Sequence, residues 1–119
     1  MIDLESVREY CLRKKGTDEA FPFGEGTLVL RVAGKMFALL GVDAVPLTIN
    51  LKCDPERAVE LRDMHPAVAP GYHMNKKLWN TVTIDGSLRD REIYEMIDHS
   101  YDEVVRKLKK SEREALAGE

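Results

Sequence analysis

Residues 47–66 have the sequence LTINLKCDPERAVELRDMHP, which joins a strand pattern directly to a helix. Apolar and polar side chains alternate over residues 47–52, as expected for an antiparallel strand with one buried side and one solvent-facing side. Asp54 followed by Pro55 is a strong helix start, because aspartate caps the first turn and proline is favoured at the first helical position. A histidine–proline pair ends the helix. This stretch therefore predicts an antiparallel sheet with a short helix beside it.

Two pairs of strands are expected on either side of this stretch. Residues 27–32 and 35–40 are rich in β-forming residues, and the alanine–glycine pair between them has the spacing of a tight hairpin. Residues 68–74 and 78–85 have the same character, and the three residues between them are expected to form a turn. The sequence therefore predicts a sheet built from two hairpins and the central strand.

Helices are expected at both ends of the chain. Asp3 is placed to cap a helix over residues 4–15, and residues 87–90 resemble a capping box that starts a long amphipathic helix. The tail of the chain, from about residue 111 to 119, is too polar to require packing and is expected to fray. Between the first helix and the sheet, Phe21 and Phe23 are expected to fill the edge of the core from an irregular loop.

The element order α-β-β-β-α-β-β-α predicts an α+β sandwich in a single domain, residues 1–119. All helices are expected on one face of an antiparallel sheet, and the other face is expected to be exposed. A chain of 119 residues with 44% hydrophobic residues can enclose one core without metals or disulfides. The two cysteines form no metal-binding motif, so reduced buried thiols are expected. No apolar run approaches the roughly 20 residues needed to cross a membrane, so a cytoplasmic protein with no membrane partner is expected.

The net charge is −3, but the charges are distributed unevenly along the chain. Residues 1–26 contain four bases and six acids, residues 27–84 contain seven and five, and residues 85–119 contain seven and ten. The total argues against a generally basic nucleic-acid-binding protein. The distribution instead predicts a basic sheet between acidic helices.

The candidate binding surface is the face of the sheet that the helices leave open. Trp79 is expected on that face, because the apolar side chains that alternate with it should face the helices. An exposed tryptophan beside cationic side chains is a combination that binds nucleic acid, through base stacking and phosphate contacts. The alternative is that Trp79 only covers Phe37. The predicted DNA contacts are Arg31, Lys35, Lys52, His73, Asn75, Lys76, Lys77 and Trp79.

No catalytic residue, cofactor or metal site is predicted. Cys53 lies beside Asp54 and could act with His65 or His73, but Asp54 is already explained as a helix cap and the spacing forms no nucleophilic motif. The acidic residues of the first helix could collect cations loosely, but the bases between them weaken that field. The sequence therefore favours a binding protein over an enzyme.

Five short motifs carry a resemblance to a known family. They are Phe21-Pro22-Phe23-Gly24, Gly34-Lys35-Met36-Phe37-Ala38, Asn50-Leu51-Lys52-Cys53-Asp54-Pro55, Tyr72-His73-Met74-Asn75-Lys76-Lys77-Leu78-Trp79 and Ser100-Tyr101. With these motifs and this order of elements, the chain resembles the MmcQ/YjbR family of small bacterial proteins over nearly its whole length. The fold of that family is similar to the fold of CyaY and frataxin.

The resemblance implies DNA binding with strand hairpins acting as wings, and it implies no catalytic residues. Residues 72–79 would form one wing and residues 33–35 the other. The frataxin-like fold also implies iron binding as a rival function, through an acidic ridge on the first helix and the adjoining strand, which bases dilute in this chain.

The sequence thus favours a non-catalytic, cytoplasmic bacterial domain that binds DNA. The main alternative is an interaction module whose Trp79 face recognises a protein or a small ligand. The sequence leaves open the DNA sequence or strand preference, the native partner and the oligomeric state.

Overall fold

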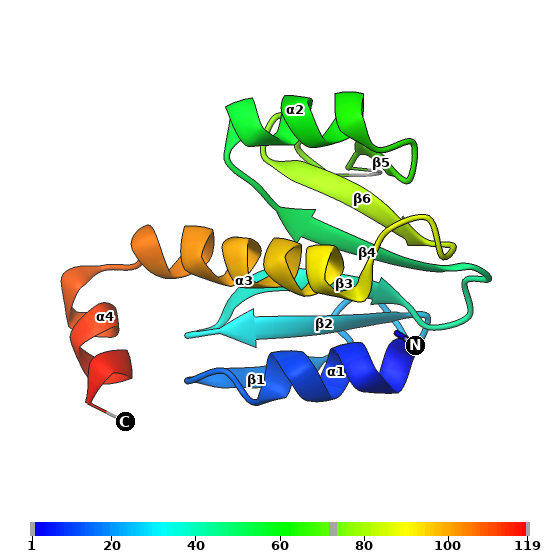
Figure 1. The fold of residues 1–119 in the computed structure, drawn as a ribbon. Coiled ribbons are helices and arrows are strands. Elements are labelled where there is room, and N and C mark those ends of the chain that lie inside the picture. The colour runs from blue at the N-terminus through cyan, green and yellow to red at the C-terminus, as the bar shows by residue number, and fades with distance from the viewer. Residues whose placement is uncertain (1, 72–73, 119) are drawn as a thin grey trace.

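The structure is a computed structural model and describes residues 2–71 and 74–118. It is an α+β fold in which helices pack on one face of a six-stranded antiparallel sheet with the strand order β1-β2-β3-β4-β6-β5 (Figure 1). The predicted fold class is confirmed. The elements are α1 (Leu4–Leu12), β1 (Thr17–Ala20), β2 (Thr27–Val32), β3 (Lys35–Gly41), β4 (Leu47–Lys52), α2 (Pro55–Met64), β5 (Val68–Pro70), β6 (Trp79–Ile84), α3 (Asp90–Arg106) and α4 (Lys110–Ala117).

The central elements form as the sequence predicts. Strand β4 covers residues 47–52 and lies between β3 and β6. The Asp54 carboxylate accepts a hydrogen bond from the Arg57 amide at 3.1 Å, and Pro55 opens α2. In the β2–β3 turn, Ala33 and Gly34 have φ angles of 50° and 76°. Positive φ at both central residues is the geometry of the mirror-image turns that match the twist of a hairpin.

The main core lies between the sheet and the helices. Leu30 of β2, Leu40 of β3 and Ile49 of β4 are fully buried there, together with Val7 of α1 and Ile97 of α3. In Figure 1, α1 and α3 run across this face of the sheet, and α2 lies at the β6–β5 edge. No helix in the described part of the chain is long and apolar enough to span a membrane.

The edge strand β1 is absent from the sequence prediction. Its four residues, TDEA, are mostly polar and lack the apolar alternation of a half-buried strand. Charged residues are typical of an edge strand, where they discourage pairing with other chains. The two aromatic residues that follow β1 do not fill the core, because Phe21 is 49% exposed and Phe23 is 63% exposed. The prediction that they close the edge of the core is therefore wrong.

The second hairpin also differs from the prediction. Strand β5 ends at Pro70, and β6 begins at Trp79, so the connection runs over residues 71–78 and is not a three-residue turn. Arg62 of α2 holds this loop: its Nε donates to Asn80 Oδ1 at 2.7 Å, and its Nη2 donates to the Lys76 carbonyl and, at 3.3 Å, to the Trp79 carbonyl. A contact from a helix distant in sequence thus sets the shape of the loop.

The C-terminal region contains two helices. Ser87 does not cap α3, because its hydroxyl donates to Asp85 at 2.6 Å; instead Glu92 accepts from the amide of Arg89, the N-cap residue, at 3.1 Å. Where the sequence predicts a frayed tail, the structure has α4. A single leucine anchors this helix, since Leu116 is 9% exposed and belongs to the main core. The first helix ends at residue 12 instead of the predicted residue 15.

A polar and aromatic cluster joins α1 to α3. Asp98 accepts hydrogen bonds from the Tyr10 hydroxyl at 2.7 Å and from Lys14 Nζ at 2.5 Å. The Lys14 ammonium also lies 5.0 Å from the Tyr10 ring and 5.2 Å from the Tyr101 ring, within reach of cation–π attraction. Burial, followed by the bond to Asp98, raises the pKa of Tyr10 to about 12. The cluster thus links α1 and the residues after it to the middle of α3.

Candidate nucleic-acid interface

Strands β3 and β4 separate at one end of the sheet, where Ser100 of α3 lies between them. Their pairing stops at Ala38 and Leu51. Beyond that pair, the fully buried Ser100 hydroxyl accepts a hydrogen bond from the Lys52 amide at 2.8 Å and donates one to the Phe37 carbonyl at 2.5 Å. The side chain replaces a ladder bond and holds the two strand ends apart, because buried backbone groups require partners.

A hollow of about 390 Å³ opens at this end of the sheet. It lies between the strand ends, the C-terminal turn of α3 and the start of α4, which turns from the end of α3 toward the β2–β3 hairpin (Figure 1). Its volume is within the range of about 300–1,000 Å³ that is typical of small-molecule sites. We call it the lysine hollow, and its walls are Lys35, Met36, Lys52, Trp79, Val104, Lys107, Leu108, Lys109 and Glu112.

The lysine hollow is strongly cationic. Four lysines and one glutamate line it, and within residues 2–71 and 74–118 none of the four ammonium groups forms an ion pair. Burial lowers the pKa of Lys52, and the nearby charge of Lys107 lowers it further. Like charges held close together repel each other, and a bound anion would relieve that repulsion. The arrangement is therefore suited to phosphate, for which lysine is a common ligand.

Trp79 lies on the predicted face of the sheet but is not exposed. Only 8% of its surface is accessible, because it packs against Val29 and Leu39 and is flanked by Met74 and Leu78 from the loop. The prediction of an exposed tryptophan is therefore wrong. The alternative that Trp79 covers Phe37 is wrong as well, because the two side chains belong to different hydrophobic clusters.

Phe37 lies on the opposite side of the sheet from Trp79. Its ring packs edge-on against Tyr101 of α3, with 5.4 Å between the ring centroids. A register shift between residues 30 and 31 of β2 accompanies this change of side in β3. Such a bulge reorients the side chains that follow it. Trp79 also borders the lysine hollow.

The structure brings together only some of the predicted DNA contacts. Lys35, Lys52 and Trp79 meet at the lysine hollow. Arg31 does not join them, since its guanidinium forms two hydrogen bonds of 2.9 Å with the Asp18 carboxylate of β1. That pairing raises the pKa of Arg31, lowers the pKa of Asp18 and balances the arginine charge.

The predicted contacts in the loop have mainly local partners. Lys76 Nζ donates to the Gly71 carbonyl at 3.3 Å, and the Asn75 side chain accepts from the Lys77 amide at 3.0 Å. His73 lies outside the described residues. The loop leads into β6 at the same end of the sheet as the lysine hollow, because Trp79, the first residue of β6, pairs with Lys52.

Two residues of the lysine hollow were missed by the sequence interpretation. Lys107 and Lys109 belong to the C-terminal segment, which contains ten acids and seven bases and was therefore classed as acidic. The run Lys107-Leu108-Lys109-Lys110 is a local basic signal within that segment. Its position beside the strand ends depends on the length and direction of α3, which the local charge pattern does not specify.

The open face of the sheet away from this end is not basic. It contains a second hollow of about 350 Å³ without a charged lining residue. The predicted basic sheet face is therefore replaced by a basic end of the sheet. The second hollow is lined by Phe23, Thr27, Leu39, Leu40, Gly41, Thr48, Asn50 and Met74.

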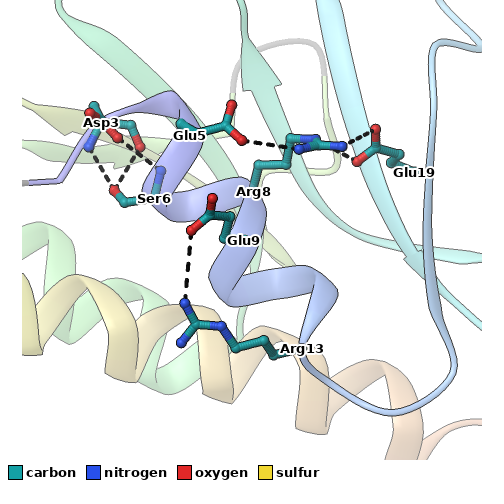
Figure 2. Close-up of polar contacts among 7 residues, drawn as sticks. All are labelled: Asp3, Glu5, Ser6, Arg8, Glu9, Arg13 and Glu19. Atoms are coloured by element: carbon teal, nitrogen blue, oxygen red, sulfur yellow. Dashed lines mark hydrogen bonds and ion pairs between the residues drawn. The ribbon is translucent and has the colours of Figure 1, made fainter.

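The acidic residues of α1 and β1 are engaged in ion pairs (Figure 2). Arg8 contacts Glu19 at 2.7 Å and Glu5 at 3.1 Å, and Arg13 lies 3.9 Å from Glu9. In the described part of the chain, no group of three His, Cys, Asp or Glu side chains is arranged to hold a metal ion. The acidic residues expected from the sequence to form a frataxin-like ridge are thus occupied by contacts with arginines.

The cysteine considered as a nucleophile has a different environment from a reactive thiol. Cys53 is 4% exposed, and burial raises its pKa to about 11. Asp54 caps α2, and its amide donates to His99 Nε2 at 3.1 Å. His65 contacts Glu92 at 3.5 Å instead of the thiol. A thiol with a raised pKa is protonated at neutral pH and is a poor nucleophile.

Comparison with known proteins identifies similar chains over nearly the full length. The family model described as YjbR matches residues 12–103. The uncharacterized protein YjbR of Escherichia coli K12 is 33% identical over 115 residues, which are 97% of this chain and 98% of that protein. The uncharacterized protein YyaQ of Bacillus subtilis is 32% identical over 116 residues, and the match covers 85% of this chain and 97% of that protein.

Solved structures have the same fold. The crystal structure of Deinococcus radiodurans protein DR2400, with a DUF419 domain, matches with a TM-score of 0.92 and 41% identity, covering 98% of this chain and 89% of that chain. A crystal structure of a Pseudomonas syringae protein matches with a TM-score of 0.71 and 30% identity, covering 83% of this chain and 96% of that chain. The names of these relatives state no activity.

Proposed function

The chain belongs to the YjbR family, and we propose that it binds DNA through phosphate contacts made by the lysine hollow. The observation that carries the proposal is the grouping of four lysines and a single glutamate around one hollow. Phosphate contacts supply most of the sequence-independent affinity of proteins for DNA. In this proposal the protein acts in the cytoplasm, and it acts by binding DNA and not by catalysis.

The proposal predicts a modest, salt-sensitive affinity. Four phosphate contacts correspond to a log–log salt slope of about −3 to −4. Raising the salt concentration from about 50 to about 200 mM should therefore weaken binding roughly 100-fold. The acidic residues elsewhere on the chain would orient the lysine end toward DNA, because an uneven charge distribution steers association.

Fluorescence anisotropy of labelled duplex and single-stranded DNA tests this proposal. The wild type is compared at low and physiological salt with a double variant, Lys35→Ala/Lys107→Ala. The matched control is Arg91→Ala/Lys110→Ala. It removes the same charge from two side chains that lie outside the hollow and are 3.8 and 3.9 Å from glutamates on their own helices.

The hollow variant should bind much more weakly and should have a salt slope smaller by about 2, since each lost phosphate contact reduces the slope by about 1. The control should retain most of the wild-type affinity. Equal weakening by both variants would reject the lysine hollow as the site. No binding by the wild type at low salt would reject DNA as the ligand.

A further inference from the structure

We propose that the lysine hollow receives a terminal phosphate, so that the protein prefers the phosphorylated end of a DNA strand to the strand interior. This inference rests on the proposed function and specifies the part of DNA that is bound. It concerns a phosphate monoester attached to a nucleoside, which occurs both at a strand end and in a free nucleotide.

The shape of the site supports an end over a continuous strand. The lysines that line the hollow come from two strands, from the residue that follows α3 and from the residue that precedes α4. A strand interior would have to bend into the hollow and out again, whereas a strand end only has to reach into it. A flat basic face would favour the strand interior, and the open face of the sheet has no charged residue in its hollow.

The charge of the site matches a monoester better than a diester. Glu112 is the one carboxylate among the residues that line the hollow, and it accepts a hydrogen bond from the Lys109 amide at 3.1 Å. Glu103, whose charge acts on Lys52 from outside the lining, is paired with Arg106 at 3.0 Å. A phosphate monoester carries a charge of about −1.5 to −2 at pH 7 and presents three acceptor oxygens. A backbone diester carries about one negative charge. The monoester therefore satisfies more of the ammonium groups in the hollow.

The uncharged wall of the hollow provides a surface for the nucleoside next to the phosphate. Met36, Trp79, Val104 and Leu108 form this wall. The accessible edge of Trp79 and the neighbouring apolar side chains can contact a base with little sequence preference, because every base has a π face. The ligand class is therefore a phosphate monoester beside an aromatic base, and not an inorganic anion alone.

The test compares one single-stranded oligonucleotide in 5′-phosphorylated, 3′-phosphorylated and unphosphorylated forms, with binding followed by the fluorescence of the protein itself. Trp79 is the only tryptophan and borders the hollow, so its emission reports directly on occupancy. A free deoxynucleoside monophosphate and inorganic phosphate are titrated separately. Lys107→Ala is compared with Lys110→Ala, a lysine variant outside the hollow.

At least one phosphorylated form should bind about tenfold more tightly than the unphosphorylated form, the size of effect expected from one additional charge-assisted contact. Lys107→Ala should remove this preference, and Lys110→Ala should keep it. Equal affinity for all three forms would overturn the end preference while leaving DNA binding intact. Binding of the free monophosphate without binding of any oligonucleotide would support the phosphate site and overturn DNA binding. No response to any of these ligands would overturn both.

Discussion

Replacing Ser100 by alanine should destabilise the protein and disturb the lysine hollow. The Ser100 hydroxyl is fully buried and serves two backbone groups at once, the Lys52 amide at 2.8 Å and the Phe37 carbonyl at 2.5 Å. Alanine fills nearly the same volume but leaves one donor and one acceptor without this partner. The packing changes little, so the effect isolates the hydrogen bonds.

The expected cost follows from those two groups. A buried polar group left unsatisfied costs about 1–3 kcal/mol, so two such groups cost about 2–6 kcal/mol. Domains of this kind have total stabilities of about 5–15 kcal/mol, so the loss is a large fraction. Urea denaturation should show a lower midpoint with an unchanged m value, which indicates a change in stability and not in the compactness of the unfolded chain.

Ser111→Ala is the matched control, because Ser111 is exposed on α4. Exposed substitutions usually change the stability by less than about 0.5 kcal/mol. If Ser100→Ala and Ser111→Ala lower the free energy of unfolding by the same small amount, the Ser100 hydroxyl does not hold the ends of β3 and β4 in place. The reasoning about the origin of the hollow would then be refuted.

Three further outcomes test other parts of the structure. Gly71→Ala should destabilise the loop by about 1–3 kcal/mol in urea unfolding, because an added Cβ would lie 2.8 Å from the Trp79 Cβ and 3.0 Å from its carbonyl oxygen; an unchanged midpoint would contradict this packing. The pKa of Tyr10 is raised to about 12 in the folded protein, above the value of about 10 expected in the unfolded chain. The contribution of this pKa shift to the free energy of unfolding is therefore complete below pH of about 10 and lost as the pH rises toward about 12. Tyr10→Phe should flatten the dependence of stability on pH in this range, as measured by urea unfolding at several pH values. A dependence identical to that of the wild type would exclude this linkage. Burial raises the pKa values of Cys11 and Cys53 to about 12 and about 11, so a thiol reagent at pH near 8 should label them only as fast as the protein unfolds, and rapid labelling of native protein would be inconsistent with their burial.

The parts of the fold that depend on local chemistry could be predicted from the sequence. The β2–β3 turn needs two residues tolerant of positive φ, and Ala33-Gly34 supplies them. The start of α2 needs a cap and a proline, and Asp54-Pro55 supplies both. These signals are contained within a few residues, so a distant element cannot easily override them.

The candidate site could be predicted only in part, because its geometry depends on distant contacts. Trp79 is on the predicted face, but a loop shaped by Arg62 of α2 covers it. Arg31 is neutralised by Asp18, which belongs to an edge strand without a clear sequence pattern. The charge pattern of the C-terminal segment did not reveal that Lys107 meets Lys35 at the end of the sheet.

The most direct test of the central claim is an amide NMR titration of the isotopically labelled protein with DNA at low salt. We expect the largest shift changes at the amides of Lys35, Lys52, Lys107 and Lys109, which surround the lysine hollow. Changes confined to the open face around Leu39, or no changes on saturation with DNA, would contradict the claim.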